Sequence, residues 1–320
     1  MLSRVADSLY WMSRYLERAQ HTARLIDVNL VLMLDQSPGF MSRRWRYVLE
    51  SLRTASPPEP LDDARMIADR LTFSREHKGS IVASIAKARD NASQVRQQIS
   101  SEMWEQLNRL YLHTSGTRID DVWNTQPHAF FRSVIDAVQL FEGITSATMN
   151  RGEGWYFIEL GRYLERAAET AALLQAQWHD AQQDGGSARD VTDYLGWVSL
   201  LKSRTAFEAY CQVYTADLRP DRVAEFLLLN DEFPQTIRFA ATKIHAAVRA
   251  VGQKTGALDG AIVERLAGRL QAELDFARID ELLVPNLHTH LEDIQRQCQQ
   301  IHAELHRIYL APPIESLLRQ

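Results

Sequence analysis

The amino-acid sequence predicts an all-α protein, built as a multi-helix bundle. Apolar residues recur at spacings of three and four over long segments, and the apolar-polar alternation of a strand is nearly absent. Clusters with the Gly, Pro, Asn and Asp chemistry of turns separate these segments. No cluster is long enough to serve as a flexible linker between domains, so we expect a single helical domain over residues 1–320.

Helices are expected between successive turn clusters. The first long helix ends at the cluster DQSPGF, and the clusters SPPEP, HTSGTR, QQDGGSARD, LRPD and NDEFP separate the later helices. In chain order, the pattern predicts long helices over 3–34, 79–112, 128–150, 153–183, 190–215, 234–252, 260–283 and 286–309. Shorter helices are expected over 41–55, 61–72 and 221–230.

Composition and charge exclude several classes of protein. The net charge is -5 and neither half is strongly basic, so no nucleic-acid partner is expected. Apolar runs are too short to span a bilayer, and no membrane partner is expected. Cys211 and Cys298 lie far apart without a histidine at ligand spacing, which predicts neither a disulfide framework nor a cysteine metal site. The first residues lack the features of a signal peptide, so we expect a cytoplasmic protein.

The hexapeptide RYLERA occurs twice in the chain. Around it, RYLERAQHTARL at 14–25 and RYLERAAETAAL at 162–173 agree at nine of twelve positions. This agreement is too dense for chance helical composition and predicts an internal duplication. We expect pseudo-repeat halves of about 1–150 and 151–320, each beginning with a long helix that carries the motif.

The motif helices are expected to lie at the centre of the bundle. At about 100° per residue, the first helix carries one apolar stripe, and Leu25 and Leu32 lie on its opposite side. A helix that is apolar on two sides is enclosed, so Glu17 and its neighbouring arginines should be at least partly sheltered from water. The predicted stripe consists of Val5, Leu9, Met12, Leu16, Ala19, Ala23, Ile26 and Leu30.

The arginines of the motif raise an electrostatic question. Arg14 and Arg18 are four residues apart, as are Arg162 and Arg166, and like charges at this spacing disfavour a helix by a few tenths of a kcal/mol. Carboxylates from another helix would offset this repulsion. An anionic ligand held by planar guanidinium groups would offset it equally well.

Glu17 and Glu165 supply such carboxylates reciprocally if the two motif helices pack against each other. Two interpretations follow from the sequence. In the first, the arginines and glutamates form an ion-pair network that fixes the register of packed helices without catalysis. In the second, the arginines bind a carboxylate or phosphate, and Glu17 and Glu165 orient them, bind an amino group or act in catalysis.

Two further segments have the composition of binding sites. In NRGEGWY at 150–156, Arg151 precedes a helix start whose free N–H groups can bind an anion, or the segment is a turn anchored by Trp155. His302 and His306 have the four-residue spacing of metal ligands, but they flank a clean apolar stripe. They are better explained as the border of a packed helix, so no metal site is predicted.

Several motifs together resemble the bacterial alpha-E family, a helical domain named for its Glu-Arg motif. They are SRYLERAQHTARLIDV, NASQVRQQISSEMWEQLNRLYL, TMNRGEGWYFIELGRYLERA and VAEFLLLNDEFPQTIRF, in this order across nearly the whole chain. Two adjacent positions depart from the family pattern, because Gln235 and Thr236 follow FP where the resemblance leads us to expect Arg-Ser.

The resemblance implies a function in a pathway that forms or processes an amide-linked peptide. Such proteins are typically encoded beside an ATP-grasp ligase and a transglutaminase-like protein, which are therefore the expected partners, with a peptide or amino-acid-derived small molecule as ligand. No glycine-rich phosphate loop occurs and no cofactor is predicted. We expect an accessory, substrate-handling protein. The alternatives are an enzyme with a glutamate general base and a purely structural scaffold.

Overall fold

The computed structural model describes residues 1–33, 37–55, 61, 63–183, 191–215, 217–256, 259–283 and 287–310. Within these ranges the regular structure is entirely helical, and no strand occurs. The predicted all-α fold class is confirmed. Of the helices in these ranges, none is both long and apolar enough to cross a bilayer.

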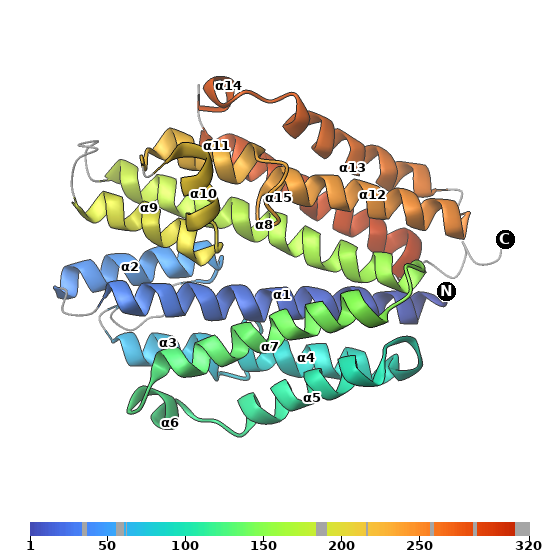
Figure 1. Ribbon diagram of the computed structural model, residues 1–320, viewed down its shortest axis with the longest axis horizontal. Coiled ribbons are helices and arrows are strands. Elements are labelled where there is room, and N and C mark those ends of the chain that lie inside the picture. The colour runs from blue at the N-terminus through green and yellow to red at the C-terminus, as the bar shows by residue number, and fades with distance from the viewer. Residues whose placement is uncertain are drawn as a thin grey trace.

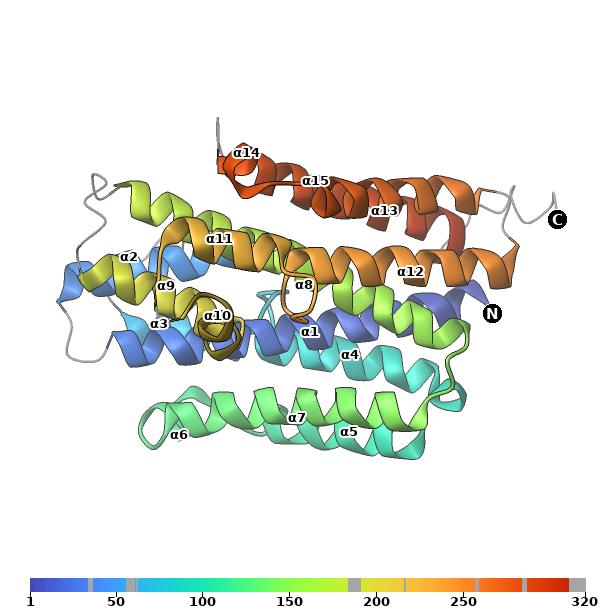
Figure 2. The same cartoon turned by 45° about the horizontal axis from the view of Figure 1, so that its top comes forward.

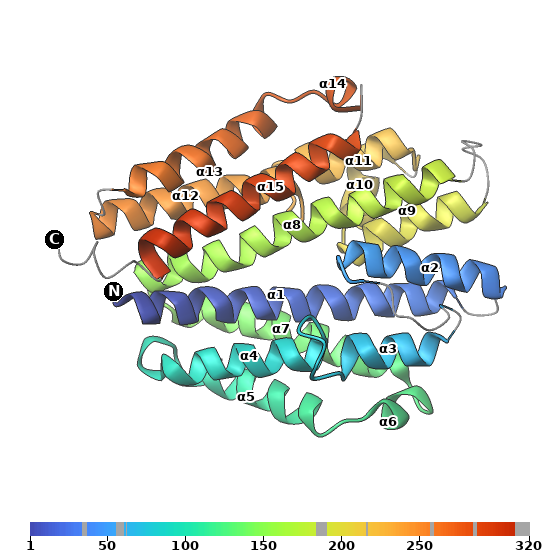
Figure 3. The same ribbon diagram turned by 180° about the vertical axis from the view of Figure 1, so that it is seen from behind.

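The two motif helices form the centre of the bundle. Helix α1 (Ser3–Leu32) and helix α8 (Glu153–Gln183) lie side by side and start at the same end of the molecule (Figures 1 and 3). The amino group of Met1 is bonded to Glu153 at 2.6 Å at that end. The apolar stripe predicted for α1 is buried over most of its length, which confirms the enclosed position expected for this helix.

Each central helix carries its own set of companion helices. Helices α4 and α7 pack on α1, and α5 packs on both of them. In the same way α12 and α15 pack on α8, and α13 packs on both (Figure 2). The bounds are Ile81–Gln94 for α4, Ser101–Ser115 for α5, Pro127–Thr148 for α7, Ile237–Thr255 for α12, Gly260–Asp275 for α13 and Leu287–Leu305 for α15.

The shorter helices follow the same order in the two halves. They are α2 (Pro38–Ser51), α3 (Ala64–Thr72) and α6 (Ile119–Trp123) in the first half, and α9 (Val191–Ser203), α11 (Pro220–Leu229) and α14 (Ile279–Leu283) in the second. Helix α10 (Phe207–Tyr214) is an additional element of the second half. The π-helical residues His306–Leu310 continue α15.

Turns at equivalent places have the same hydrogen bonds. Before α4, the Ser80 hydroxyl donates to the Ser74 carbonyl at 2.5 Å, and before α12 the Thr236 hydroxyl donates to the Asn230 carbonyl at 2.5 Å. Ser80 and Thr236 then cap their helices. This agreement supports the predicted duplication, which remains an inference.

A second pair of equivalent turns follows α2 and α9. The Thr54 N–H donates to the Leu49 carbonyl at 2.9 Å, and the Ala206 N–H donates to the Leu201 carbonyl at 2.8 Å. The residue before each donor has a positive φ, 52° at Arg53 and 49° at Thr205. The residues preceding these, Leu52 and Arg204, therefore occupy equivalent positions.

Some predicted helices are divided in the structure. The helix expected over 79–112 is interrupted by the 3-10 turn Arg96–Gln98, after which Ser100 caps α5. This break lets α5 fold back against α4. The helix expected over 190–215 is likewise divided into α9 and α10 at the left-handed Thr205. The helix expected over 260–283 is divided into α13 and α14, and the short helix α6 was not predicted.

Candidate functional site

Glu165 is held by two arginines of the other motif helix. Arg14 donates to one of its oxygens from Nε at 2.7 Å and from Nη2 at 2.6 Å. Arg18 binds the second oxygen with the same two distances. Burial of Glu165, whose side chain is 1% exposed, would raise its pKa, but the two guanidinium groups outweigh burial and lower the pKa to about 2. Glu165 is therefore an ionised, fully paired carboxylate.

The reciprocal contact joins Glu17 to Arg166. Arg166 donates from Nε and from Nη2 to the two oxygens of Glu17, both at 2.7 Å, in a fork that suits a carboxylate. Burial opposes ionisation of Glu17, but Arg166 and then Arg204 lower its pKa below the usual range. Each Glu-Arg dipeptide thus binds the other, because α1 and α8 are parallel and aligned in the register of the repeat. The sequence had suggested this reciprocal pairing.

Arg162 does not repeat the contacts of its equivalent, Arg14. Its side chain binds Glu142 of α7 at 3.2 Å and Glu159 of its own helix at 3.0 Å. Burial raises the pKa of Glu159, and Arg162 only partly opposes this. The structure therefore places Arg162 beside the cluster, facing α7, and its charge is already balanced there.

Arg151 lies apart from the other predicted site residues. Its guanidinium donates to the Ser146 carbonyl at 3.0 Å and sits 3.5 Å from the centre of the Trp155 ring. Arg151 is exposed and does not reach the Glu-Arg pairs. The turn interpretation of 150–156, with the tryptophan as an anchor, describes these contacts, and a ligand role for Arg151 stays a prediction.

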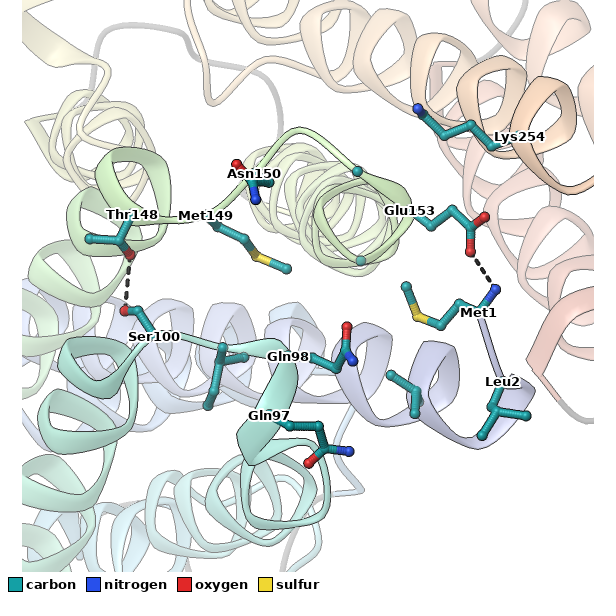
Figure 4. A pocket seen from close by; sticks show the side chains of 14 residues that line it. Met1, Leu2, Gln97, Gln98, Ser100, Thr148, Met149, Asn150, Glu153 and Lys254 are labelled. Carbon is teal, nitrogen blue, oxygen red and sulfur yellow. Dashed lines mark hydrogen bonds and ion pairs between the residues drawn. The ribbon is translucent and has the colours of Figure 1, made fainter.

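A pocket of about 890 Å³ opens at the end of the bundle where α1 and α8 begin. In Figure 4 the Met1 amino group points to Glu153 on one side, and Thr148 and Ser100 are bonded on the other. Lys254 also lines this pocket, whereas Arg151 does not. The acidic group that faces it, Glu153, is already paired with the amino group.

Arg204 is a central residue that the sequence did not indicate. It follows α9, is 1% exposed and donates from Nη1 to His21 Nδ1 at 3.0 Å and from Nη2 to Gln235 Oε1 at 2.7 Å. The nearest carboxylate oxygens, of Glu17 and Glu169, are both 3.9 Å away. Burial lowers its pKa to about 10 although both glutamates oppose this. Its Nε has no hydrogen-bond partner among the described residues.

His21 and Glu169 complete the inner part of this cluster. A guanidinium only donates, so His21 Nδ1 accepts from Arg204 and the ring proton is on Nε2, which has no described partner. Burial and then Arg204 hold the pKa of His21 well below its usual value. Burial, together with Glu165 and Glu17, raises the pKa of Glu169 well above its usual value and so disfavours its charged form. Its Oε2 is also without a described hydrogen-bond partner.

Arg24 is the second buried arginine that sequence reasoning missed. It is 5% exposed and makes no hydrogen bond or ion pair with the part of the chain that the structure describes. Burial lowers its pKa; Glu17 opposes the shift and Arg166 adds to it. Arg24 and Arg204 both contribute to the low pKa of His21, which places the three groups in one electrostatic environment.

The repeated motif could have indicated two residues of the inner cluster, His21 and Glu169. His21 and Glu169 follow Glu17 and Glu165 by four residues, and therefore share their helix faces. They are also equivalent positions of the two motif copies. Arg204 carried no such signal, because it lies at the break between α9 and α10 that the sequence pattern did not reveal.

The remaining candidates lie outside this inner cluster. His302 Nδ1 is 2.8 Å from the Tyr10 hydroxyl, which accepts from Arg14 at 3.1 Å. Burial and Arg14 lower the pKa of His302 to about 4. Within the described ranges, no group of three or more His, Cys, Asp or Glu side chains is arranged to hold a metal. Gln235 binds Arg204, and Thr236 caps α12 as a serine would.

Comparison with known proteins fits a Glu-Arg motif at the centre of a helical domain. The family model Alpha-E, described as a predicted alpha-helical domain with a conserved ER motif, matches residues 1–310. This chain belongs to the Alpha-E family. The Glu-Arg dipeptides that begin at Glu17 and Glu165 are the ones that bind each other between α1 and α8.

Two relatives of this Alpha-E protein carry the name of uncharacterized proteins. The chain is similar to the uncharacterized protein Rv2567 of Mycobacterium tuberculosis and to the uncharacterized protein Mb2597 of Mycobacterium bovis. Each is 28% identical over 201 residues, which cover 54% of this chain and 22% of the relative. The aligned region is therefore about a fifth of the relatives' own length. No solved structure matches this chain.

Proposed function

We propose that this Alpha-E protein binds the carboxylate or phosphate of a peptide- or amino-acid-derived molecule. Its role is that of a substrate-handling partner of an ATP-grasp ligase in an amide-forming pathway. The observation that carries this proposal is an excess of guanidinium groups over carboxylates in the central cluster. Between α1, α8 and the end of α9, the described carboxylates Glu17, Glu165 and Glu169 are outnumbered by the guanidinium groups of Arg14, Arg18, Arg24, Arg166 and Arg204.

The excess arises because Arg24 has no ion pair with the described residues and Arg204 approaches its carboxylate partners, Glu17 and Glu169, only to 3.9 Å. Glu17 and Glu165 are already engaged by Arg166 and by Arg14 and Arg18, respectively. Burial and the neighbouring Glu165 and Glu17 raise the pKa of Glu169 well above its usual value, which disfavours its negative charge. Burying an unpaired charge costs free energy because the charge loses its hydration, and an anionic ligand would offset that cost.

A general-base role suits neither motif glutamate well. A base needs an accessible lone pair and a pKa near the working pH. Glu17 and Glu165 are buried, ion-paired and shifted to low pKa. Their geometry supports a structural function, fixing the two motif helices in register, while the ligand is bound by other groups of the same cluster.

The enzyme alternative has a direct test in the variant Glu17→Gln. If Glu17 is a general base, this variant loses pathway turnover while it still binds its partner proteins. We expect instead that any folded fraction of Glu17→Gln supports turnover. Loss of turnover by fully folded Glu17→Gln, with partner binding intact, would establish the enzyme and overturn our proposal.

The partner proposal comes from the family resemblance and is tested by co-purification. The full chain is expressed with an ATP-grasp ligase and a transglutaminase-like protein of the kind that the family resemblance implies, and the purified material is analysed by mass spectrometry for proteins and retained small molecules. We expect the ligase and an anionic peptide or amino-acid derivative. A chain that retains neither of them would contradict the proposed function.

A further inference from the structure

We propose that the pocket at the end of the bundle where α1 and α8 begin binds a short peptide that has a free carboxylate. Lys254 pairs with the carboxylate, and the side-chain amides that line the pocket bind the peptide backbone. The site is distinct from the central cluster, because Glu165 follows Glu153 at the start of α8 by 12 residues, or about 18 Å of helix. The inference therefore goes beyond the proposed function and does not depend on it.

The first argument is the size and construction of the pocket. Its volume of about 890 Å³ lies within the range of about 300–1,000 Å³ that small-molecule sites occupy. Its walls come from the starts of α1 and α8, the 3-10 turn before α5, the end of α7 and the end of α12. Val5, Ile99 and Met149 make part of the lining apolar. Such a pocket suits a ligand that is partly apolar and carries a few polar groups.

The second argument is the set of free amide groups. Gln97, Gln98 and Asn150 line the pocket and make no side-chain hydrogen bond with the described residues. The Gln98 carboxamide points into the space between Met149 and Met1 (Figure 4). A carboxamide offers two N–H donors and one acceptor oxygen. The three side chains can therefore bind both the C=O and the N–H groups of a peptide.

The third argument is charge. Lys254 is exposed, lines the pocket and makes no ion pair with the described part of the chain. Glu153, the one carboxylate among the described lining residues, is already bonded to the Met1 amino group at 2.6 Å. The pocket therefore has a positive charge that no lining group balances, and the N-terminal ends of α1 and α8 add partial positive charge. A carboxylate on the ligand would balance it.

The lining also favours a peptide over a nucleotide. Of the described residues that line the pocket, none has an aromatic side chain, so no ring is available on which a base could stack. One lysine without an ion pair matches a single carboxylate rather than the several charges of a nucleoside phosphate. A short aliphatic peptide matches the apolar part of the lining, the carboxamides and the lysine together.

Titration calorimetry of the full chain with N-acetyl-trialanine and with its C-terminal amide tests the role of the carboxylate. We expect saturable binding of the acid and about two- to five-fold weaker binding of the amide, as loss of one exposed ion pair implies. Lys254→Ala should bind the acid no better than the amide. Lys243→Ala is the matched control, because Lys243 is exposed on the same helix but does not line the pocket, and it should keep the preference for the acid.

A second pair of variants tests where the peptide binds. A Cβ atom on Gly152, which lines the pocket, would meet nothing within 4 Å. Gly152→Phe therefore adds a ring without a clash at its Cβ, and it should weaken binding of the acid about ten-fold or more because the ring takes space that the peptide needs. Gly143→Phe in α7 is the matched control, since Gly143 is equally open but lies outside the pocket, and it should bind as the unaltered chain does.

The outcomes separate this inference from the proposed function. Absence of saturable binding by the folded chain, equal binding of acid and amide, or binding that Gly152→Phe retains would each overturn the inference. If Gly152→Phe does not fold, the comparison of Lys254→Ala with Lys243→Ala decides the result. Binding that depends on the pocket supports the site even when no ligase co-purifies, in which case only the proposed function fails.

Discussion

At the scale of single residues, Glu165 keeps a negative charge in a place that excludes water. Its four contacts to Arg14 and Arg18 lie between 2.6 and 2.7 Å, and they stabilise the ionised form. Removing one partner of a buried ion pair leaves the other charges uncompensated. The free energy of unfolding is then expected to fall by about 3–5 kcal/mol.

We therefore predict that Glu165→Gln lowers the free energy of unfolding by about 3–5 kcal/mol at pH 7. The pKa of Glu165 falls from 4.5 to about 2 on folding, so its contribution is complete above about pH 4.5 and is lost as the pH falls through about 2. Chemical denaturation at several pH values should show the two proteins converging as the solution is acidified. A difference that stays constant down to pH 3 would refute this assignment.

Contacts between residues were predictable where the sequence repeats itself. Arg14, Arg18, Glu17, Glu165 and Arg166 stood out because the hexapeptide occurs twice, and the structure brings these side chains together. The contacts of Arg204 were not predictable. They depend on where α9 ends against α1, a long-range contact that spacing along one helix does not encode.

At the scale of elements, the approach of α1 to α8 depends on a glycine. A Cβ atom on Gly161 would lie 2.2 Å from the Tyr10 carbonyl oxygen and 2.2 Å from Ser13 Oγ. A backbone oxygen cannot move aside as a flexible side chain can. The glycine therefore sets the spacing at which the Glu-Arg pairs meet, one to two turns further along the helices.

Gly161→Ala is predicted to separate the two helices and to lower the free energy of unfolding by about 3 kcal/mol, in the upper range for an overpacked core. The matched control is Gly143→Ala in α7, where an added Cβ meets nothing within 4 Å. That control should be neutral or gain about 0.5–1 kcal/mol. Equal stability of the two variants in thermal unfolding would mean that the close approach is unimportant.

The helices themselves were predictable where apolar periodicity is long and ends in strong turn residues. The prediction over 153–183 matches α8, and the first helix differs from its prediction only at its end. The breaks near 96–98 and at Thr205 were missed, because apolar spacing continues across them. Such breaks result from helices folding back on one another, which tertiary contacts decide.

At the scale of the whole molecule, the two halves share one interior. The pairs formed by Glu17 and Glu165 cross from the first half to the second, and the core is a continuous cluster that includes both motif helices. Separating the halves would expose apolar faces together with unpaired buried charges. The predicted single domain over 1–320 is consistent with this arrangement and remains a prediction.

We predict that the full chain unfolds in one cooperative transition. Helix content by circular dichroism and tryptophan fluorescence should change at the same denaturant concentration, because Trp45 and Trp197 are buried in different halves of one core. Two separate transitions, one for each half, would show that the halves are independent domains.

The account as a whole makes the Glu-Arg pairs the contacts that hold α1 and α8 together. The most direct test is a double-mutant cycle of Glu17→Gln and Arg166→Met, in which the free energy of unfolding of both single variants and of the double variant is measured. Our account predicts that the double variant loses less stability than the two single variants together, by about 0.5–3 kcal/mol, because each single variant leaves a buried charge without its partner. Strictly additive losses would contradict it.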